Sequence, residues 1–252
     1  MLPESSASPQ APPTIDLPTP QRALAVVAHP DDAEFQCGAT LARWAAAGCE
    51  VSHLICTDGS KGTWDHQADQ AQLVVTRQAE QKKAAETLGA TGRVVFLGHT
   101  DGELDSGLRQ RAQVAYWIRA LRPTVVLGHD PWKHYRLHPD HRHAGLLVVE
   151  GVVAARDPFF FPEHEVPPHR PDALLLFEAE TPDHLENVTG FLDTKVAALE
   201  AHASQFETTH GIDEGNGATR AAFRQRVADK LTVMAGQHGP EHAEAYKLIT
   251  DL

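Results

Sequence analysis

The alternation of apolar runs with helix-like segments limits the fold more than any other feature of this sequence. A segment with helical spacing of apolar residues follows each of the first four apolar runs. The runs that we interpret as strands cover residues 23–28, 51–56, 93–97, 124–128 and 173–177. Because these runs are continuously apolar, they are typical of parallel strands with helices on both faces. The sequence therefore predicts an α/β fold with an open, mostly parallel sheet.

Helical spacing and turn residues place the expected helices. The helices that the sequence predicts cover residues 36–47, 70–88, 108–121, 138–155, 187–203 and 217–237. Right-handed crossovers bring the loops after the first four strands to one edge of the sheet. Most reactive side chains of the chain lie in those four loops. We therefore expect any functional site at that edge.

The length of 252 residues suits one large α/β domain, which we expect over residues 21–252. Residues 1–20 are rich in Pro and Ser and contain few large apolar side chains. Such a segment buries too little surface to offset its ordering entropy. The sequence therefore predicts a disordered or loosely docked tail over residues 1–20.

Composition and charge exclude several classes of protein. The net charge of −12 argues against a general nucleic-acid binder, because phosphate affinity comes from clustered Lys and Arg. No stretch approaches the roughly 20 apolar residues of a membrane span, and no signal-peptide pattern begins the sequence. The odd set Cys37, Cys49 and Cys56 has no CxxC spacing, so we expect free, buried thiols. These features favour a cytoplasmic protein.

Two His-Pro-Asp groups lie at the ends of predicted strands. Ala28-His29-Pro30-Asp31-Asp32 follows the first strand, and His138-Pro139-Asp140-His141 opens the helix after the fourth. Ligands of open α/β sheets bind outside the carboxyl ends of the strands. A catalytic zinc typically has three protein ligands, and it accepts both imidazole and carboxylate. We therefore expect His29 and Asp32 to hold a metal with His141 as the third ligand, although Asp31 and Asp32 can instead cap the helix.

The residues beside the expected ligands suit acid–base chemistry. Asp31 would lie off the metal, where a carboxylate next to a metal-bound water can act as general base. His138, one turn from His141, could as imidazolium stabilise an oxyanion and protonate a leaving amine. The alternatives are that Asp31 caps the helix or orients His29, and that His138 merely starts a helix. Asp140 could orient His141 or His138, or act as a cap.

Together with three further segments, these groups resemble the LmbE-like (PIG-L) zinc deacetylases. The further segments are Thr57-Asp58-Gly59, Arg77-Gln78-Ala79-Glu80 with Leu88-Gly89, and Asp101-Gly102. The resemblance covers residues 22–150 and continues more loosely through Lys195, His202-Ala203-Ser204-Gln205 and Ala245-Tyr246. The family includes deacetylases of N-acetylglucosaminyl-phosphatidylinositol and of the mycothiol and bacillithiol pathways.

The resemblance implies a Rossmann-like fold and removal of an N-acetyl group from an N-acetylglucosamine-type conjugate. It implies that His29, Asp32 and His141 bind Zn²⁺, with Fe²⁺ or another divalent ion as the alternative. A zinc-bound water would then attack the amide with Asp31 as general base. His138 would stabilise the oxyanion and act as acid.

The resemblance also implies substrate contacts. It assigns Arg77 and Asp101 to the sugar or its appended group; the alternatives are a surface ion pair of Arg77 with Glu80 and a turn role for Asp101. Some members of the family have a Tyr two residues before HPDH, where this sequence has Arg136 beside Tyr135. We expect Tyr135 or Arg136 to contact the substrate.

The first reading is therefore a zinc-dependent N-deacetylase whose partner is a small-molecule amino sugar conjugate, with homo-oligomerisation left open. A second reading is an amidase that acts on a thiol-sugar conjugate or a secondary metabolite. A third is a metal- or sugar-binding module without turnover. A binding module has no need of an acid–base pair such as Asp31 and His138, which disfavours the third reading.

Overall fold

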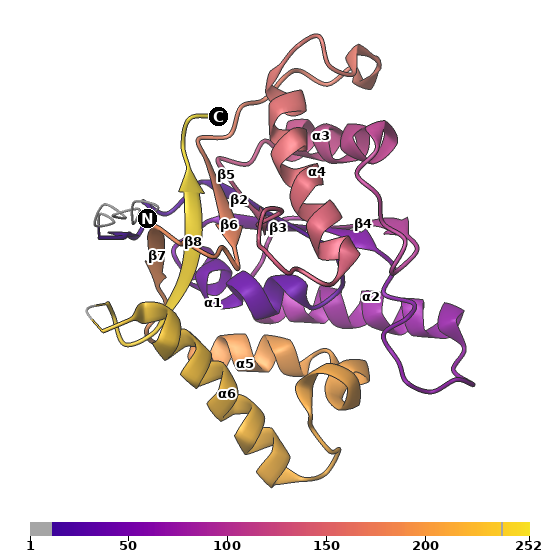
Figure 1. The fold of residues 1–252 in the computed structure, drawn as a ribbon, viewed down its shortest axis with the longest axis vertical. Helices are drawn as coiled ribbons and strands as arrows, with labels where there is room; N and C mark the ends of the chain where they lie inside the picture. The colour runs from indigo at the N-terminus through magenta and orange to yellow at the C-terminus, as the bar shows by residue number, and fades with distance from the viewer. Residues whose placement is uncertain (1–11, 238) are drawn as a thin grey trace, which may run out of the picture.

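The computed structural model describes residues 12–237 and 239–252. Its centre is an eight-stranded sheet in the order β1-β7-β8-β6-β5-β2-β3-β4 (Figure 1). The strands are β1 (Thr14–Ile15), β2 (Arg22–Val27), β3 (Glu50–Thr57), β4 (Val94–His99), β5 (Val125–His129), β6 (Ala173–Phe177), β7 (His184–Asn187) and β8 (Ala243–Ile249). Neighbouring strands pair in parallel except where β8 pairs with β6 and β7. The predicted open, mostly parallel sheet is confirmed.

Helices cover both faces of this sheet. They are α1 (Asp32–Ala46), α2 (Gln70–Thr87), α3 (Leu108–Leu121), α4 (Pro139–Arg156), α5 (Leu192–Glu200) and α6 (Gly217–Ala235). In Figure 1, α3 and α4 lie on one side of the sheet, and α1 and α2 lie on the other. Helix α5 packs on α1 and α2, and α6 packs on α5 and β8. The C-terminal helices therefore form an outer layer beyond α1.

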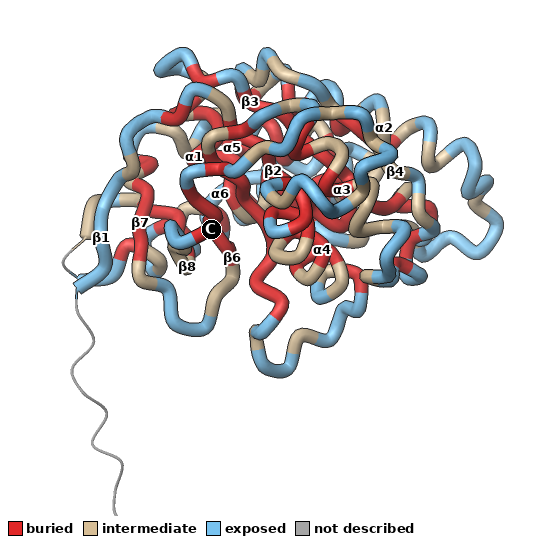
Figure 2. Tube along the Cα trace, turned by 90° about the horizontal axis from the view of Figure 1, so that it is seen from above, coloured by how far each residue is buried: buried red, intermediate tan, exposed pale blue. Residues whose placement is uncertain are grey.

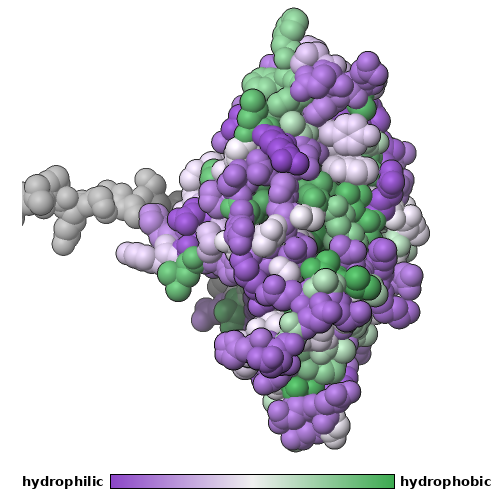
Figure 3. Space-filling view, turned by 90° about the vertical axis from the view of Figure 1, so that its right-hand side faces the viewer, coloured by the Kyte–Doolittle hydropathy of each residue, from purple (hydrophilic) through white to green (hydrophobic). Residues whose placement is uncertain are grey.

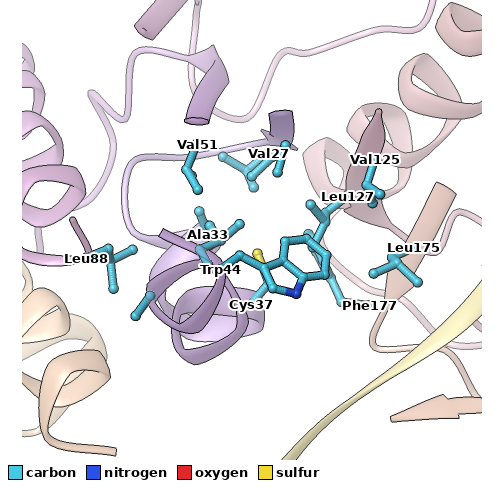
Figure 4. Close-up of a cluster of buried hydrophobic side chains, with 14 of the residues drawn as sticks. Val27, Ala33, Cys37, Trp44, Val51, Leu88, Val125, Leu127, Leu175 and Phe177 are labelled. Carbon is cyan, nitrogen blue, oxygen red and sulfur yellow. The ribbon is translucent and has the colours of Figure 1, made fainter. Parts of the chain in front are cut away.

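The side chains of β2 alternate between two hydrophobic cores. Ala25 and Val27 join the cluster on the α1 side, where Trp44 is fully buried (Figure 4). Leu24 and Val26 point to the opposite cluster, between the sheet and α3 and α4. Each large apolar side chain contributes roughly 1.5–3 kcal/mol on full burial. Figure 2 shows that burial is concentrated along the central strands, so β2 is anchored from both faces.

The strand order places a topological switch point at β2. From β2 the chain proceeds outward to β3 and β4, then returns to β5 on the other side of β2. The loops after β2 and β5 therefore leave neighbouring strands in opposite directions, which opens a crevice at their carboxyl ends. These loops are residues 28–31 and 130–138, and they carry the two His-Pro-Asp groups.

Several elements differ from the sequence prediction. Helix α1 begins at Asp32, four residues before the predicted start, so the loop after β2 is only residues 28–31. The predicted helix over residues 187–203 shortens to α5, because Gly190 has a φ of 91° in the preceding turn. Strands β7 and β8 were not predicted. Both contain charged residues, such as Glu186 and Glu244, whose burial in ion pairs a reading of apolar runs does not detect.

Of the tail predicted to be disordered or loosely docked, residues 12–20 are docked on the edge of the sheet. Thr14 and Ile15 form β1, which pairs in parallel with β7. The Leu17 amide donates to Glu186 Oε1, and Asp16 accepts a hydrogen bond from Arg43. The prediction counted only apolar burial, whereas backbone pairing and polar contacts dock this segment. The rest of the predicted tail, residues 1–11, lies outside the described residues.

The cysteines and the helix hydropathy were also subjects of the sequence analysis. Cys37, Cys49 and Cys56 are free and buried, as predicted. Within residues 12–237 and 239–252, no helix has the length and hydropathy needed to cross a membrane. On the face shown in Figure 3, hydrophobic residues form separate groups among hydrophilic ones, in keeping with the two internal cores.

Candidate active site

A cavity of about 500 Å³ lies at the predicted edge of the sheet. Seven of the predicted site residues line it: His29, Asp31, Asp32, Arg77, Asp101, His138 and His141. They come from the loops after β2 and β4, from the first residue of α1, from α2 and from the start of α4. The structure thus gathers residues that are up to 112 positions apart in the sequence, 29 to 141, around one open cavity.

Carboxylates hold both ring nitrogens of His29. Its Nδ1 lies 3.3 Å from Asp32 Oδ2, and its Nε2 lies 3.1 Å from Asp140 Oδ2 and 3.2 Å from Asp101 Oδ1. Asp140 is fully buried and also accepts the backbone N–H groups of Gly102 and Leu104. Asp140 therefore orients His29, rather than His141 or His138 as the sequence suggested.

Asp32 is the acceptor around which the histidines gather. His141 Nε2 lies 3.2 Å from Asp32 Oδ1, and His129 Nε2 lies 3.4 Å from Oδ2. Burial acts to raise the pKa of Asp32, but the His141 charge and hydrogen bonds from His129, His141 and His29 lower it well below its usual value. Asp32 is thus held as a carboxylate. His129, at the end of β5, was missed by the sequence analysis because its Gly128-His129 setting has no recognisable motif.

The donor set His29, Asp32 and His141 fits a divalent cation. One ligand atom from each residue lies within 4.8 Å of the other two. Ligands at about 2.0–2.2 Å from one zinc ion in tetrahedral geometry are separated by roughly 3.3–3.6 Å. Asp32 Oδ2 lies 3.3 Å from His29 Nδ1, and Asp32 Oδ1 lies 3.2 Å from His141 Nε2, so each carboxylate oxygen is close to that spacing from one imidazole. A ligating imidazole usually donates its other N–H to a carboxylate, which Asp140 provides for His29.

Two other groups in the described residues have comparable spacing. One is His29, Asp101 and His138, and the other is His129, His141 and Glu178. Glu178 already accepts a hydrogen bond from the Arg136 guanidinium at 2.8 Å, and that positive charge disfavours a cation beside it. The group His29, Asp101 and His138 shares the cavity with the first group. The ligand assignment to His29, Asp32 and His141 stays a prediction that this spacing supports.

Asp31 occupies a strained position at the start of α1. Its backbone has φ 107° and ψ −26°, a conformation that residues with a side chain rarely adopt. Its Oδ2 accepts a hydrogen bond from Arg77 Nη2 at 3.1 Å. Burial raises the pKa of Asp31 to about 6, against the lowering effect of the Arg77 charge. Asp31 and Asp32 are adjacent and equally buried, yet their pKa values shift in opposite directions.

Arg77 is a buried residue and not part of a surface ion pair. Its side chain is 3% exposed, and it donates to the carbonyl oxygens of Gly59 and Pro30. A Cβ on Gly62 would lie 2.3 Å from Arg77 Nη1, so this glycine leaves room for the guanidinium. The alternative of an Arg77–Glu80 pair is wrong, because Glu80 instead accepts hydrogen bonds from Ser204. Arg77 still lines the cavity, and its contact with substrate stays a prediction.

His138 lies over the His29 and His141 rings at the cavity wall. Its ring centroid is 4.6 Å from that of His29 and 4.9 Å from that of His141. Partial burial and the charges of His29 and His141 lower the pKa of His138. The free protein therefore favours a neutral His138 near pH 7, whereas the sequence analysis considered an imidazolium.

Of the other residues that the sequence analysis assigned to the substrate, one lines the cavity and two do not. Asp101 lines the cavity, is 6% exposed and accepts the Lys61 backbone N–H. Tyr135 and Arg136 do not line it. Tyr135 is 94% exposed, and the Arg136 side chain is buried against Glu178. In this structure Arg136 thus supports the loop after β5, and neither residue faces the cavity.

Other cavity residues were not predicted as site residues. They are Phe35, Gln36, Lys61, Gly62, Gly102, Gln205 and Thr209. Gln205 and Thr209 belong to a short 3₁₀ helix (Ala203–Gln205) and a π-helix (Phe206–His210) after α5. Short π-helical segments often occur at functional sites. These two residues reach the cavity because their segment packs beside loops that lie more than 100 residues earlier in the sequence. A local sequence pattern does not indicate such packing.

The sequence matches a known protein family over the segment that carries most of the cavity residues. The family model described as "GlcNAc-PI de-N-acetylase" (PIG-L) matches residues 24–152, more than half of the chain. The diacetylchitobiose deacetylase of Thermococcus kodakarensis is 34% identical over 189 residues, covering 74% of this chain and 70% of that protein. This chain belongs to the PIG-L family. The cavity residues of the loops after β2, β3, β4 and β5 all lie inside the matched segment, whereas Gln205 and Thr209 lie outside it.

Two more relatives show how far the likeness of this PIG-L protein extends. A 1D-myo-inositol 2-acetamido-2-deoxy-alpha-D-glucopyranoside deacetylase of Streptomyces avermitilis is 35% identical over 178 residues. That match covers 60% of this chain and 59% of the relative. The structure of N,N'-diacetylchitobiose deacetylase from Pyrococcus horikoshii superposes with a TM-score of 0.82 and 24% identity, covering 92% of this chain and 84% of that one. At this identity the structural likeness concerns the fold.

Proposed function

We propose that this protein is a metal-dependent hydrolase that removes the N-acetyl group from an N-acetylglucosamine-type sugar conjugate. The single observation that carries the proposal is the convergence of His29, Asp32 and His141 beside Asp31 at one cavity. Membership of the PIG-L family supports the same reaction, because relatives at 34% and 35% identity are named as deacetylases of N-acetylated sugars.

The metal would be held by His29, Asp32 and His141. A divalent ion such as Zn²⁺ or Fe²⁺ supplies there a Lewis acid that polarises the amide carbonyl and makes water more acidic. The protein supplies the ligand orientation, since Asp140 fixes His29 and His129 supports Asp32.

Asp31 would move the proton. One of its carboxylate oxygens, Oδ2, is occupied by Arg77. Asp31 lines the cavity, where its carboxylate can accept a proton from the attacking water. When the C–N bond breaks, Asp31 returns that proton to the amine nitrogen, so water is split between acetate and the amine. The raised pKa of Asp31 suits this exchange, because a carboxylate with a pKa near 6 both accepts and releases protons near neutrality.

His138 and the cavity wall would position the acetyl group and the sugar. A neutral His138 can donate one ring N–H to the amide oxygen as negative charge develops there. Asp101 and Arg77 also line the cavity, and sugar hydroxyl groups are natural partners for such charged side chains.

The direct test is a substrate panel with the metal-loaded protein. Acetate and free amine are measured for N-acetylglucosamine, N,N'-diacetylchitobiose, a GlcNAc–inositol conjugate and a GlcNAc–thiol conjugate. Simple N-acetylated amino acids serve as controls. We expect stoichiometric acetate and amine from at least one of the three sugars without a thiol, at a higher rate than from the thiol conjugate, and none from the amino acids.

The same panel separates the rival functions. Preference for the thiol conjugate favours the amidase reading, and metal binding without hydrolysis of any amide favours a binding module. Either result contradicts the proposal that simple N-acetylglucosamine conjugates are the substrate.

A further inference from the structure

The backbone of Asp31 needs support from its surroundings. A residue with a side chain at φ 107° is strained, and such strain persists only where neighbouring groups impose it. The side chain of Asp31 makes no capping hydrogen bond to α1. Contacts from other elements must therefore hold the residue in place.

Helix α2 provides two such contacts. The Asp31 backbone N–H donates to Gln81 Oε1 at 2.9 Å. Arg77, one turn earlier on α2, donates to the Pro30 carbonyl at 2.6 Å and to Asp31 Oδ2 at 3.1 Å. Residues four positions apart lie on the same helix face, so α2 holds both polar groups of the peptide between Pro30 and Asp31, the carbonyl through Arg77 and the N–H through Gln81.

Glu34 fixes the orientation of the Gln81 amide. Gln81 Nε2 donates to Glu34 Oε1 at 2.8 Å, and both side chains are fully buried. Only one orientation satisfies both neighbours, because a flipped amide would turn its NH₂ toward the Asp31 N–H and its oxygen toward the Glu34 carboxylate. Gln81 can therefore accept from Asp31 only while Glu34 accepts from Gln81.

Histidines from two other elements face Glu34. His202 Nε2 lies 3.4 Å from Glu34 Oε2, and His53 Nε2 lies 3.8 Å from Oε1. All three side chains are fully buried, where a carboxylate is stable only with a partner. Gln81, Glu34, His53 and His202 do not line the cavity. Gln81 contacts the cavity residue Asp31 directly, so an effect of Gln81 on the reaction can pass through Asp31.

We propose that Gln81 and Glu34 are positioning residues that hold the Asp31 peptide in its strained conformation and thereby aim the Asp31 carboxylate into the cavity. The inference rests on the proposed function, in which Asp31 handles the proton. It adds two residues that neither contact the cavity nor belong to the metal-ligand set.

The first test replaces the Gln81 amide by an apolar group of similar length. We expect Gln81→Met to lower kcat by roughly 10- to 100-fold, because a displacement of about 1 Å in a reacting group can cost that much. KM and bound metal should stay within twofold of wild type. The matched control is Gln113→Met. Gln113 is a partly buried glutamine on α3 that contacts His99 at the end of β4, and its replacement should leave kcat unchanged.

The second test uses Glu34. In Glu34→Gln the new amide oxygen still accepts from Gln81, so we expect kcat within about threefold of wild type. In Glu34→Ala that acceptor is lost, and kcat should fall as far as in Gln81→Met. Turnover is expressed per folded, metal-containing molecule, so that simple loss of stability does not enter. Should Gln81→Met not fold, Gln81→Asn tests the same bond, because its shorter side chain withdraws the acceptor from Asp31.

Two outcomes overturn the inference: wild-type kcat in Gln81→Met or Gln81→Asn, or equal losses in Glu34→Gln and Glu34→Ala. Failure of the proposed function is distinguishable from both, since it would leave the wild-type protein without turnover on any sugar conjugate.

Discussion

Helix α1 contains one buried glutamate, Glu34, and contacts another, Glu244 of β8, and the surroundings of the two differ sharply. Both oxygens of Glu244 are engaged: the Ala39 and Thr40 N–H groups and Lys195 Nζ donate to them, and the Tyr246 hydroxyl lies 3.1 Å from Oε2. Glu34 is equally buried, but only Oε1 accepts a hydrogen bond in the described part of the chain. Its Oε2 has His202 at 3.4 Å.

The difference separates two uses of a buried carboxylate. Glu244 joins α1 to α5 and β8 through a saturated set of partners, as expected of a group that stabilises the fold. Glu34 lies one turn from the cavity and connects, through Gln81, to the strained Asp31. We infer that changes at the catalytic end of α1 affect turnover, whereas changes near Glu244 affect stability.

The largest expected effect is at the catalytic end. Replacing His141 by Ala should remove bound metal and lower turnover by at least about 10³-fold, because a three-ligand site loses one donor. Metal content by elemental analysis and acetate release measure the two effects. His143→Ala is the control, since His143 is on the same helix but contacts Ser106 outside the cavity. Stoichiometric metal in His141→Ala would contradict the ligand assignment.

A smaller effect, of a different kind, is expected at Glu244. Glu244→Gln leaves the Lys195 ammonium without its carboxylate, and breaking a buried ion pair typically costs about 3–5 kcal/mol of unfolding free energy. Denaturant unfolding measures the loss. The kcat of the folded fraction should stay within twofold of wild type. A fall in kcat at full metal content would remove the distinction between the two glutamates.

The smallest expected effect concerns pH and the outer layer beyond α1. Burial, together with the positive charges of His202, Arg226 and Arg77, lowers the pKa of His210 to about 3. Since an unfolded His has a pKa of about 6.5, the unfolded state binds the extra proton as pH falls below that value. Stability contributed by neutral His210 is therefore complete above pH 6.5 and declines toward pH 3, by at most about 1.4 kcal/mol per pH unit.

Comparing wild type with His210→Gln in urea at pH 7, 6 and 5 isolates this contribution. We expect the unfolding free energy of wild type to fall relative to that of His210→Gln as pH falls from 7 to 5. If the unfolding free energy of wild type relative to that of His210→Gln stays constant or rises toward pH 5, His210 is not held neutral.

Much of the site followed from local sequence because the reactive residues lie in short loops at strand ends. His29, Asp31 and Asp32 fall within four residues, and His138 and His141 within four more, so one fold rule brought them together. Their supporting residues were not predictable. His129 and Gln81 reach the site through docking of distant segments, and a single Gln or His in a helix or strand has no distinguishing pattern.

The fold shows the same division. Continuous apolar runs predicted the strands at the centre of the sheet, where both faces are buried. Strands β1, β7 and β8, at the other edge, mix polar and apolar residues and depend on ion pairs such as Arg43–Glu186 and Lys195–Glu244. A pattern of apolar residues does not indicate such ion pairs, so the sequence analysis did not predict the strands at that edge.

The central claim is that the adjacent residues Asp31 and Asp32 have different tasks: Asp32 holds the metal and Asp31 moves the proton. The most direct measurement is metal content and turnover of Asp31→Asn, which keeps the backbone N–H for Gln81 and an oxygen for Arg77. We predict one metal per chain, as in wild type, with kcat lowered by roughly 10²- to 10⁴-fold. Loss of the metal, or turnover near the wild-type rate, would contradict the account.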